Sequence, residues 1–76
     1  MISPAQIRMA RAGLGISVRV LSERANVADS TIHRFEANRG GMQTSTLERL
    51  QTALEAEGVV FLAADAMGGP GVRLKA

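Results

Sequence analysis

The sequence contains no cysteine, only one histidine and no long apolar run. Without cysteine the chain can form neither disulfides nor thiolate metal sites, and one histidine leaves too few ligands for a zinc centre. No stretch approaches the ~20 apolar residues that span a bilayer, and the first residues lack the basic and apolar regions of a signal peptide. We therefore expect a cytoplasmic protein without a metal or cofactor.

The residues needed for catalysis are also scarce. A chain of 76 residues forms one small domain, which buries only roughly 60% of its unfolded surface and leaves little room for a catalytic cleft. With no cysteine, one histidine and no phosphate-binding glycine loop, no pair of nucleophile and base can be assembled. The chain is not expected to be an enzyme. Its net charge of +2 is a mild bias that permits binding to a polyanion without demonstrating it.

Residues 17–39 contain two short helical patterns joined by a tight turn. Ser17 can cap the first helix, and apolar residues such as Leu21 then recur at helical spacing. Asn26 tolerates the left-handed conformation that ends helices. Val27 follows within the turn, where an apolar residue is expected only if it is buried. The pattern predicts two helices held at a fixed corner.

The second of these helices is predicted to span about 29–38. Asp29 suits its N-terminus, and Ile32, Phe35 and Glu36 mark one side. The other side carries hydrogen-bonding side chains, namely Ser30, Thr31, His33, Arg34 and Asn38. An exposed helix face of this kind suits reading the edges of base pairs in the major groove.

Two further helices are expected on either side of this unit. Ser3 and Gln6 have the spacing of a capping box, with proline between them, so a first helix should run to about Ala12. After two glycines, Thr44 or Gln43 should open a fourth helix that closes at Gly58. Its apolar stripe is Leu47, Leu50 and Leu54.

The spacing of apolar residues changes from a helical to a strand-like pattern after Gly58. Residues 59–64 form a nearly continuous apolar run, and residues 72–75 alternate apolar with basic, so both read as strands joined by a loop over residues 65–71. The fold predicted is mainly α, with four helices over residues 1–57 and a β-hairpin over residues 58–76. A lone hairpin with two apolar faces needs a second cover, which a partner chain could provide. The expected dimer interface is Val59, Val60, Phe61, Leu62, Val72 and Leu74.

Taken together, these segments resemble the phage-repressor family of small bacterial helix-turn-helix regulators, the Cro-like or xenobiotic-response-element group. The resemblance rests on joint spacing: RMARAGL at residues 8–14, Ser17 with LSERA at 21–25, Val27, STI at 30–32, FE at 35–36 and TL at 46–47. The closing segments, GVVF and GPGVRL, are similar to the ends of many short bacterial members. The resemblance implies a repressor-like transcription regulator that binds specific double-stranded DNA as a homodimer.

The resemblance also implies roles for individual residues. Arg11 would pair with Glu36 in a structural ion pair. The base-contacting positions would be Asp29, Ser30, His33 and Arg34. The phosphate-contacting positions would be Arg19, Thr31, Asn38, Arg39, Thr44 and Ser45. Two of these have ordinary alternatives, because Arg19 could pair with Glu23 on the helix surface and His33 could be a solvated residue.

Three residues depart from the family pattern. Val18 stands where many members carry a phosphate-contacting glutamine, and Ala28 where a serine or threonine often caps the second helix. Asp29 stands where a neutral or basic residue is common, and either it or Ser30 could take over the cap. Val18 and Asp29, together with the mild net charge, favour a second hypothesis, a protein-interaction module or antitoxin-like protein that uses the same scaffold. The salt dependence of binding distinguishes the two hypotheses, because binding to a polyanion weakens steeply as the salt concentration rises.

Overall fold

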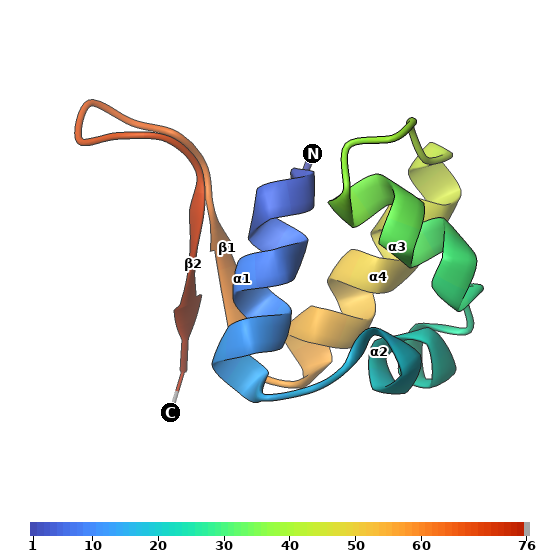
Figure 1. The fold of residues 1–76 in the computed structure, drawn as a ribbon. Helices are drawn as coiled ribbons and strands as arrows, with labels where there is room; N and C mark the ends of the chain where they lie inside the picture. The colour runs from blue at the N-terminus through green and yellow to red at the C-terminus, as the bar shows by residue number, and fades with distance from the viewer. Residues whose placement is uncertain (76) are drawn as a thin grey trace.

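The computed structural model describes residues 1–75, in which four helices precede a two-stranded hairpin. The elements are α1 (Pro4–Leu14), α2 (Val18–Ala25), α3 (Asp29–Glu36), α4 (Thr44–Ala56), β1 (Val59–Leu62) and β2 (Gly71–Leu74). The mainly helical fold predicted from the sequence is confirmed. Figure 1 shows α1 in the middle of the molecule, with the hairpin on one side and the other three helices on the other.

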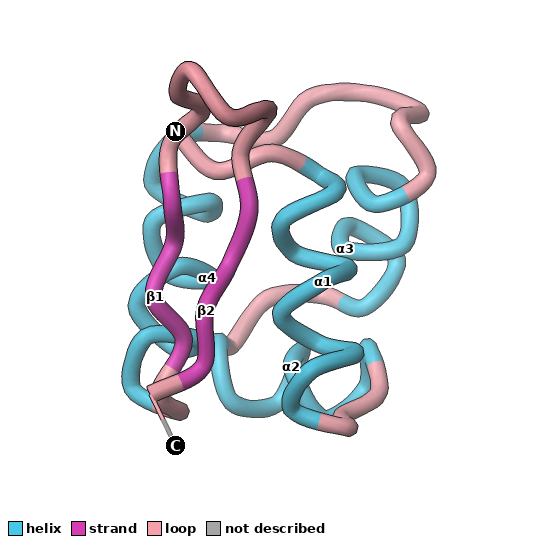
Figure 2. The backbone as a smooth tube through the Cα atoms, turned by 90° about the vertical axis from the view of Figure 1, so that its left-hand side faces the viewer, coloured by secondary structure: helices cyan, strands magenta, loops and turns pink. Residues whose placement is uncertain are grey.

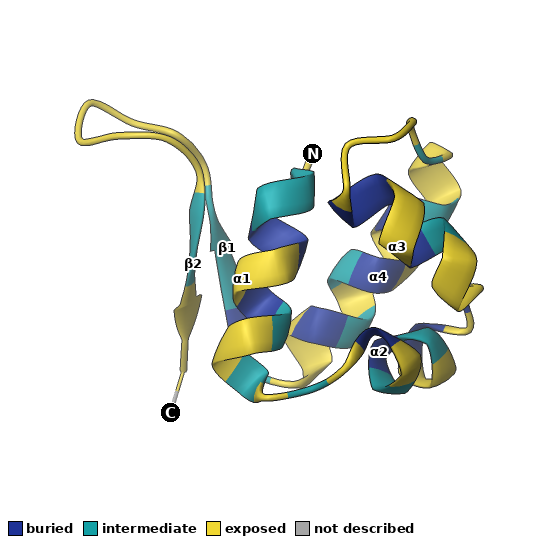
Figure 3. Ribbon diagram, in the orientation of Figure 1, coloured by how far each residue is buried: buried dark blue, intermediate teal, exposed yellow. Residues whose placement is uncertain are grey.

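One apolar core joins all the elements. Ile7, Leu21 and Ile32 are fully buried and come from α1, α2 and α3. Leu50 and Leu54 supply the same core from α4. The apolar residues of each helix recur at helical spacing, so each helix buries one stripe and exposes the opposite side. Figure 3 shows this division, with dark residues facing inward and exposed residues outward.

The first helix begins with the capping box that the sequence predicts. The Ser3 hydroxyl accepts a hydrogen bond from the Gln6 N–H at 3.2 Å, and the Gln6 side chain accepts one from the Ser3 N–H at 2.8 Å. The helix ends two residues later than the predicted Ala12, at Leu14. Gly15 then takes the left-handed conformation, with φ 69°. Glycine adopts this conformation without steric cost, so the helix stops here.

The third helix is shorter than predicted, because it ends at Glu36 and not at residue 38. Asn38 has φ 59°, and its N–H donates to Phe35 O at 3.0 Å. The next N–H, of Arg39, donates to Arg34 O at 2.9 Å. These two bonds form a Schellman motif, which satisfies the last carbonyls of a helix. Asn38 is therefore the left-handed residue that ends α3.

The strands are also slightly displaced from the prediction. β1 stops at Leu62 and not at residue 64, and β2 begins at Gly71 and stops at Leu74. They pair antiparallel with Val59 opposite Leu74 and Phe61 opposite Val72. Figure 2 shows this sheet face on, with α4 behind it and α1 beside β2. None of the helices over residues 1–75 is long and apolar enough to cross a membrane.

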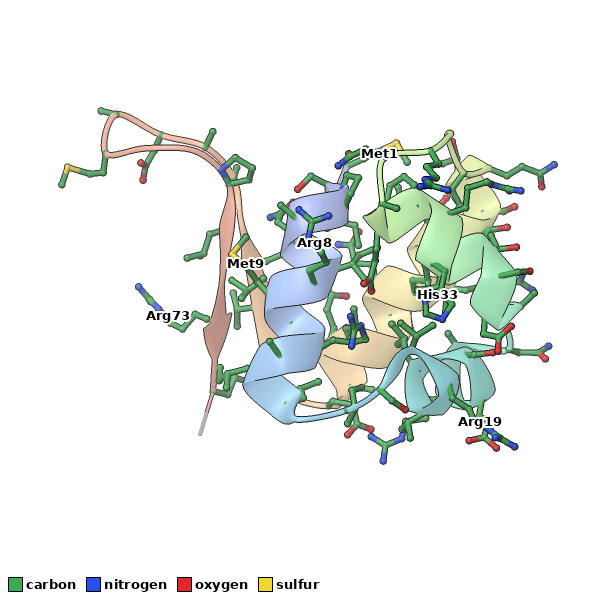
Figure 4. All side chains as sticks on the ribbon, in the orientation of Figure 1. Met1, Arg8, Met9, Arg19, His33 and Arg73 are labelled. Atoms are coloured by element: carbon green, nitrogen blue, oxygen red, sulfur yellow. The ribbon has the colours of Figure 1, made fainter. Side chains whose placement is uncertain are left out.

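One face of the hairpin belongs to the core. Val59 is only 1% exposed, and Phe61 and Val72 pack against the buried cluster. Val60, Leu62 and Arg73 lie on the other face, because side chains alternate along a strand. Figure 4 shows Arg73 pointing away from α1. Val59 therefore gives its side chain to the chain's own core and not to the outer face of the hairpin.

Candidate nucleic-acid interface

Ser22 holds the corner between α2 and α3. Its hydroxyl donates to Val27 O at 2.5 Å, and its carbonyl accepts from the Val27 N–H at 3.1 Å. Asn26 sits in the left-handed conformation with φ 55°, and Val27 is buried. The turn residues are thus fixed by both hydrogen bonds and packing. The hydrogen bond of Ser22 to the turn was not predicted from the sequence.

The inner side of α3 is anchored in the core and the outer side is free. Ile32, Phe35 and Glu36 are buried, whereas Ser30, His33 and Arg34 are exposed. The last three line an open hollow of about 690 Å³, together with Ala37 and Arg39. Figure 4 shows His33 on the outer side of α3. The structure thus gathers three of the four expected base contacts and one expected phosphate contact in one place.

The Arg34 side chain lies over the turn that follows α3. A side chain at Gly40 would meet Cδ and Nε of Arg34 at 3.7 Å, and Gly40 itself has φ 144°. That backbone conformation favours glycine. Arg34 therefore lies within van der Waals distance of this turn, and both Arg34 and Arg39 are exposed and line the same hollow.

The N-terminus of α3 has no side-chain cap. Ala28 occupies the cap position with φ −58° and ψ 137°, and no side chain of the described residues bonds to the helix start. Asp29 and Ser30, which could have taken over the cap, are exposed and do not do so. Their polar atoms are thus free to meet a ligand, and Asp29 places a negative charge at the start of the helix.

The remaining expected phosphate contacts lie around this surface. Asn38 and Arg39 are exposed in the loop that leads from α3 to α4, and Thr31 is half-buried on α3. Thr44 and Ser45 are exposed in the first turn of α4, whose cap residue Gln43 makes no side-chain bond to the helix. The free N–H groups of such a helix start favour an anion.

Arg19 and Val18 lie on α2 rather than around the hollow. Arg19 is exposed and points outward, as Figure 4 shows. Val18 is buried in the core at the start of the helix. Val18, which stands where the resemblance would lead one to expect a phosphate-contacting glutamine, thus contributes packing in this chain.

Two arginines of α1 hold the C-terminal end of α3. Arg11 donates from Nε to Glu36 Oε2 at 2.8 Å and from Nη2 to Oε1 at 2.7 Å, and Nη1 donates to Ile16 O at 3.2 Å. The hydrogen bond with Glu36 raises the pKa of Arg11 above its ordinary value, against the opposing effect of burial. Arg8 donates to the backbone carbonyl of the same Glu36. The structure thus brings Arg11 and Glu36 together and adds Arg8, which the sequence alone did not single out.

Ser30, His33, Arg34 and Arg39 thus lie on one exposed polar surface formed by α3 and the turn after it. Among residues 1–75, no three His, Cys, Asp or Glu side chains are grouped closely enough to hold a metal ion. A model of a protein family described as a helix-turn-helix domain matches residues 5–64, which span all four helices and β1. No curated protein matches the chain.

Proposed function

Because the chain belongs to the family of helix-turn-helix domains, we propose that it is a transcription regulator that binds specific double-stranded DNA sequences as a homodimer. Family membership points to DNA binding, and the exposed side of α3 is the observation that carries the finer proposal. Ser30, His33 and Arg34 face outward from a helix whose other side is buried. A helix anchored in this way can enter the major groove, where its side chains meet base edges.

The proposed contacts divide into two groups. Arg34 reads guanine, because its planar guanidinium can donate to O6 and N7 together, and Ser30 and His33 contact neighbouring edges. Asp29 accepts from a cytosine amino group. The second group holds the phosphates and fixes the register of the helix on the duplex. It comprises Arg19, Thr31, Asn38, Arg39, Thr44 and Ser45, of which the last two stand at the open start of α4.

We propose that the dimer forms through the free edge of β1. Lys75 N–H donates to Gly58 O at 2.9 Å, so every second residue of β1 bonds to β2 and the N–H and C=O groups of Val59 and Phe61 point the other way. β1 carries no charge, whereas β2 has Arg73 near its end. Charged residues protect an edge from pairing, so β1 is the edge that remains available.

The outer face of the hairpin supports the same interface. Val60 and Leu62 are half-buried there, and neither packs against the chain's own core. Two β1 strands paired about a twofold axis would make a four-stranded sheet with these side chains at its centre. Of the six residues expected at the interface, Val60 and Leu62 supply side chains, Val59 and Phe61 supply backbone groups, and Val72 and Leu74 lie on the inner face.

A selection of bound sequences from random duplex DNA at moderate salt tests this function directly. We expect an inverted repeat, with half-site centres about one helical turn apart. The affinity for the selected site should fall steeply with salt, with a slope of about −0.9 for each phosphate contacted. Enrichment of no sequence, with binding that does not change with salt, would contradict the proposal.

The second candidate function, a module that binds another protein, is favoured by the apolar face of the hairpin and by its loop. Met67 is 93% exposed at the tip of that loop, whose turn is held by a 2.8 Å hydrogen bond from the Met67 N–H to Asp65. An antitoxin-like regulator would use both surfaces. Binding through an apolar interface hardly changes with salt, so the same titration separates the two candidates.

A further inference from the structure

Gln6 is buried, being 3% exposed, and its amide uses both of its ends. The oxygen accepts from the Ser3 N–H at the start of α1. The Nε2 group donates to Leu62 O and to Gly71 O, both at 3.0 Å. A buried amide is stable only when its polar atoms are paired. This one is paired on one side with α1 and on the other with both strands of the hairpin.

The two carbonyls mark the end of the sheet nearest the hairpin loop. Leu62 and Gly71 are opposite each other in the register, as the last residue of β1 and the first of β2. At the far end, Leu74 lies close to Gly13, where an added side chain would approach Leu74 Cδ1 to 3.3 Å. The hairpin is therefore held to α1 at both ends, by hydrogen bonds at Gln6 and by close packing at Gly13.

The opposite side of α1 holds α3. Arg8 lies about 200° around the helix from Gln6, since successive residues turn by about 100°. Arg8 and Arg11 together bind the backbone carbonyl and the carboxylate of Glu36, at the end of α3. Figure 1 shows α1 between the hairpin and α3, and it packs on both. The hairpin and α3 share no comparable packing.

We infer that Gln6 is a positioning residue, which fixes the two recognition helices of the dimer relative to each other and so sets the half-site spacing that the dimer accepts. The inference rests on the proposed function. With the twofold axis at β1, one path to α3 runs from Leu62 and Gly71 through Gln6 to α1, and then through its arginines to Glu36. The far end of β1 is held separately, because Val59 is buried and β1 packs on α4. If Gln6 loses its hydrogen bonds to Leu62 and Gly71, the loop end of the hairpin can tilt relative to α1, and the distance between the two α3 helices of the dimer then varies.

The test compares Gln6→Met with Ser3→Ala. Each variant removes one of the two reciprocal bonds of the capping box. Only Gln6→Met also removes the hydrogen bonds to Leu62 and Gly71. A difference between the two variants therefore reports the loss of the bonds to the hairpin and not the loss of the helix cap. The probes are duplexes in which the selected half-sites are separated by spacers of varied length, together with a single half-site. The dimer mass and the far-UV circular dichroism of each protein are measured alongside.

For the wild type and Ser3→Ala we expect one strongly preferred spacing. For Gln6→Met we expect the affinity ratio between the best spacing and its neighbours to fall about tenfold, because avidity depends on whether the geometry allows both halves to engage. Its single half-site affinity and dimer mass should match the wild type, because Gln6 is remote from the reading surface of α3.

An unchanged spacing preference in a folded, dimeric Gln6→Met protein would overturn the inference while leaving the proposed function intact. A wild type that stays monomeric or selects no DNA would overturn both. If Gln6→Met loses the fold, Gln6→Ala carries the same comparison, because alanine favours the helix and donates nothing to Leu62 or Gly71. An unaltered preference in that variant counts equally against the inference.

Discussion

Arg11 and Glu36 meet through two hydrogen bonds of 2.8 and 2.7 Å, although they are 25 residues apart in the chain. The Glu36 side chain is only 8% exposed, and the Arg11 side chain 23%. A carboxylate taken out of water in this way is stable only while its partner stays in place. The pair therefore fixes the end of α3 against α1, and its loss should be felt throughout the fold.

Replacing Arg11 by methionine should lower the free energy of unfolding by about 3 kcal/mol, the lower part of the range for a buried pair that loses one partner. The lower part is expected because Arg11 is partly exposed. Urea unfolding measures the change. Arg24→Met is the matched control, because Arg24 pairs with Glu57 at 2.5 Å but both side chains are exposed. Such surface pairs contribute roughly 0–1 kcal/mol. Equal losses in the two variants would contradict the role given to Arg11.

The stabilisation by this pair should not fade in mildly alkaline solution. The pKa of Arg11 is raised above its ordinary value, mainly by the hydrogen bond with Glu36. A raised pKa means that the contribution is complete below the ordinary value and is lost only as pH rises through the higher one. The difference in unfolding free energy between wild type and Arg11→Met should thus be constant from neutral pH to about pH 10. A steady decline over that interval would show that the guanidinium is not the stabilising group.

The sequence predicted the helices well because their apolar residues repeat at a clear period. Ile32 and Phe35 on α3 were expected to be buried, and they are. The ends of the elements were harder to predict. Asn38, for example, is a polar residue of a kind common on exposed helix faces, and only its left-handed backbone conformation shows that it ends α3. The continuous apolar run of β1 also gave no indication of which face turns inward. The burial of Val59 in the chain's own core could not be read from it.

Apart from the Arg11–Glu36 pair, which the family resemblance implied, the contacts between residues distant in the chain could not be predicted. Gln6 was expected to cap its own helix, because that partner is three residues away. Its bonds to the hairpin reach across 56 and 65 residues, for which no local pattern exists. Arg8 is similar, since an exposed arginine on a helix gives no sign of its partner on another helix. The missed contacts are thus the ones that only the folded chain creates.

Arg34→Ala should weaken binding to the selected site by roughly 1–3 kcal/mol and relax the preference at one base pair, while non-specific binding barely changes. The reason is that a bidentate arginine discriminates guanine from other bases. Competition with duplexes changed at single base pairs, at fixed salt, measures the effect. Arg73→Ala, on the outer face of the hairpin, is the control for loss of one positive charge. An equal loss on every sequence would place Arg34 among the phosphate contacts.

Val60→Lys should convert the proposed dimer to a monomer, because it places a charge on each side of the proposed twofold axis, where two paired β1 strands would set Val60 against its own copy. Sedimentation equilibrium measures the mass. Thr52→Lys adds the same charge at an exposed position of α4 and should leave the dimer unchanged. Removing the whole hairpin is a poorer test, because it also strips Val59 from the core. A dimeric Val60→Lys protein would move the interface away from β1.

Ala28→Ser should stabilise the fold by about 1 kcal/mol, because it supplies the side-chain cap that α3 lacks. Ala28 already has an extended backbone, with φ −58° and ψ 137°, so the hydroxyl can accept from a free N–H of the first turn. Ala37→Ser, at the other end of the same helix, is the matched control and should give no gain. Urea unfolding compares the two, and equal effects would mean that the helix start is already satisfied by solvent. Because the cap leaves the outer side of α3 unchanged, affinity for the selected DNA should stay within about twofold of the wild type. A larger gain in affinity would show that fraying of the uncapped first turn of α3, rather than the identity of its exposed side chains, limits the affinity for DNA.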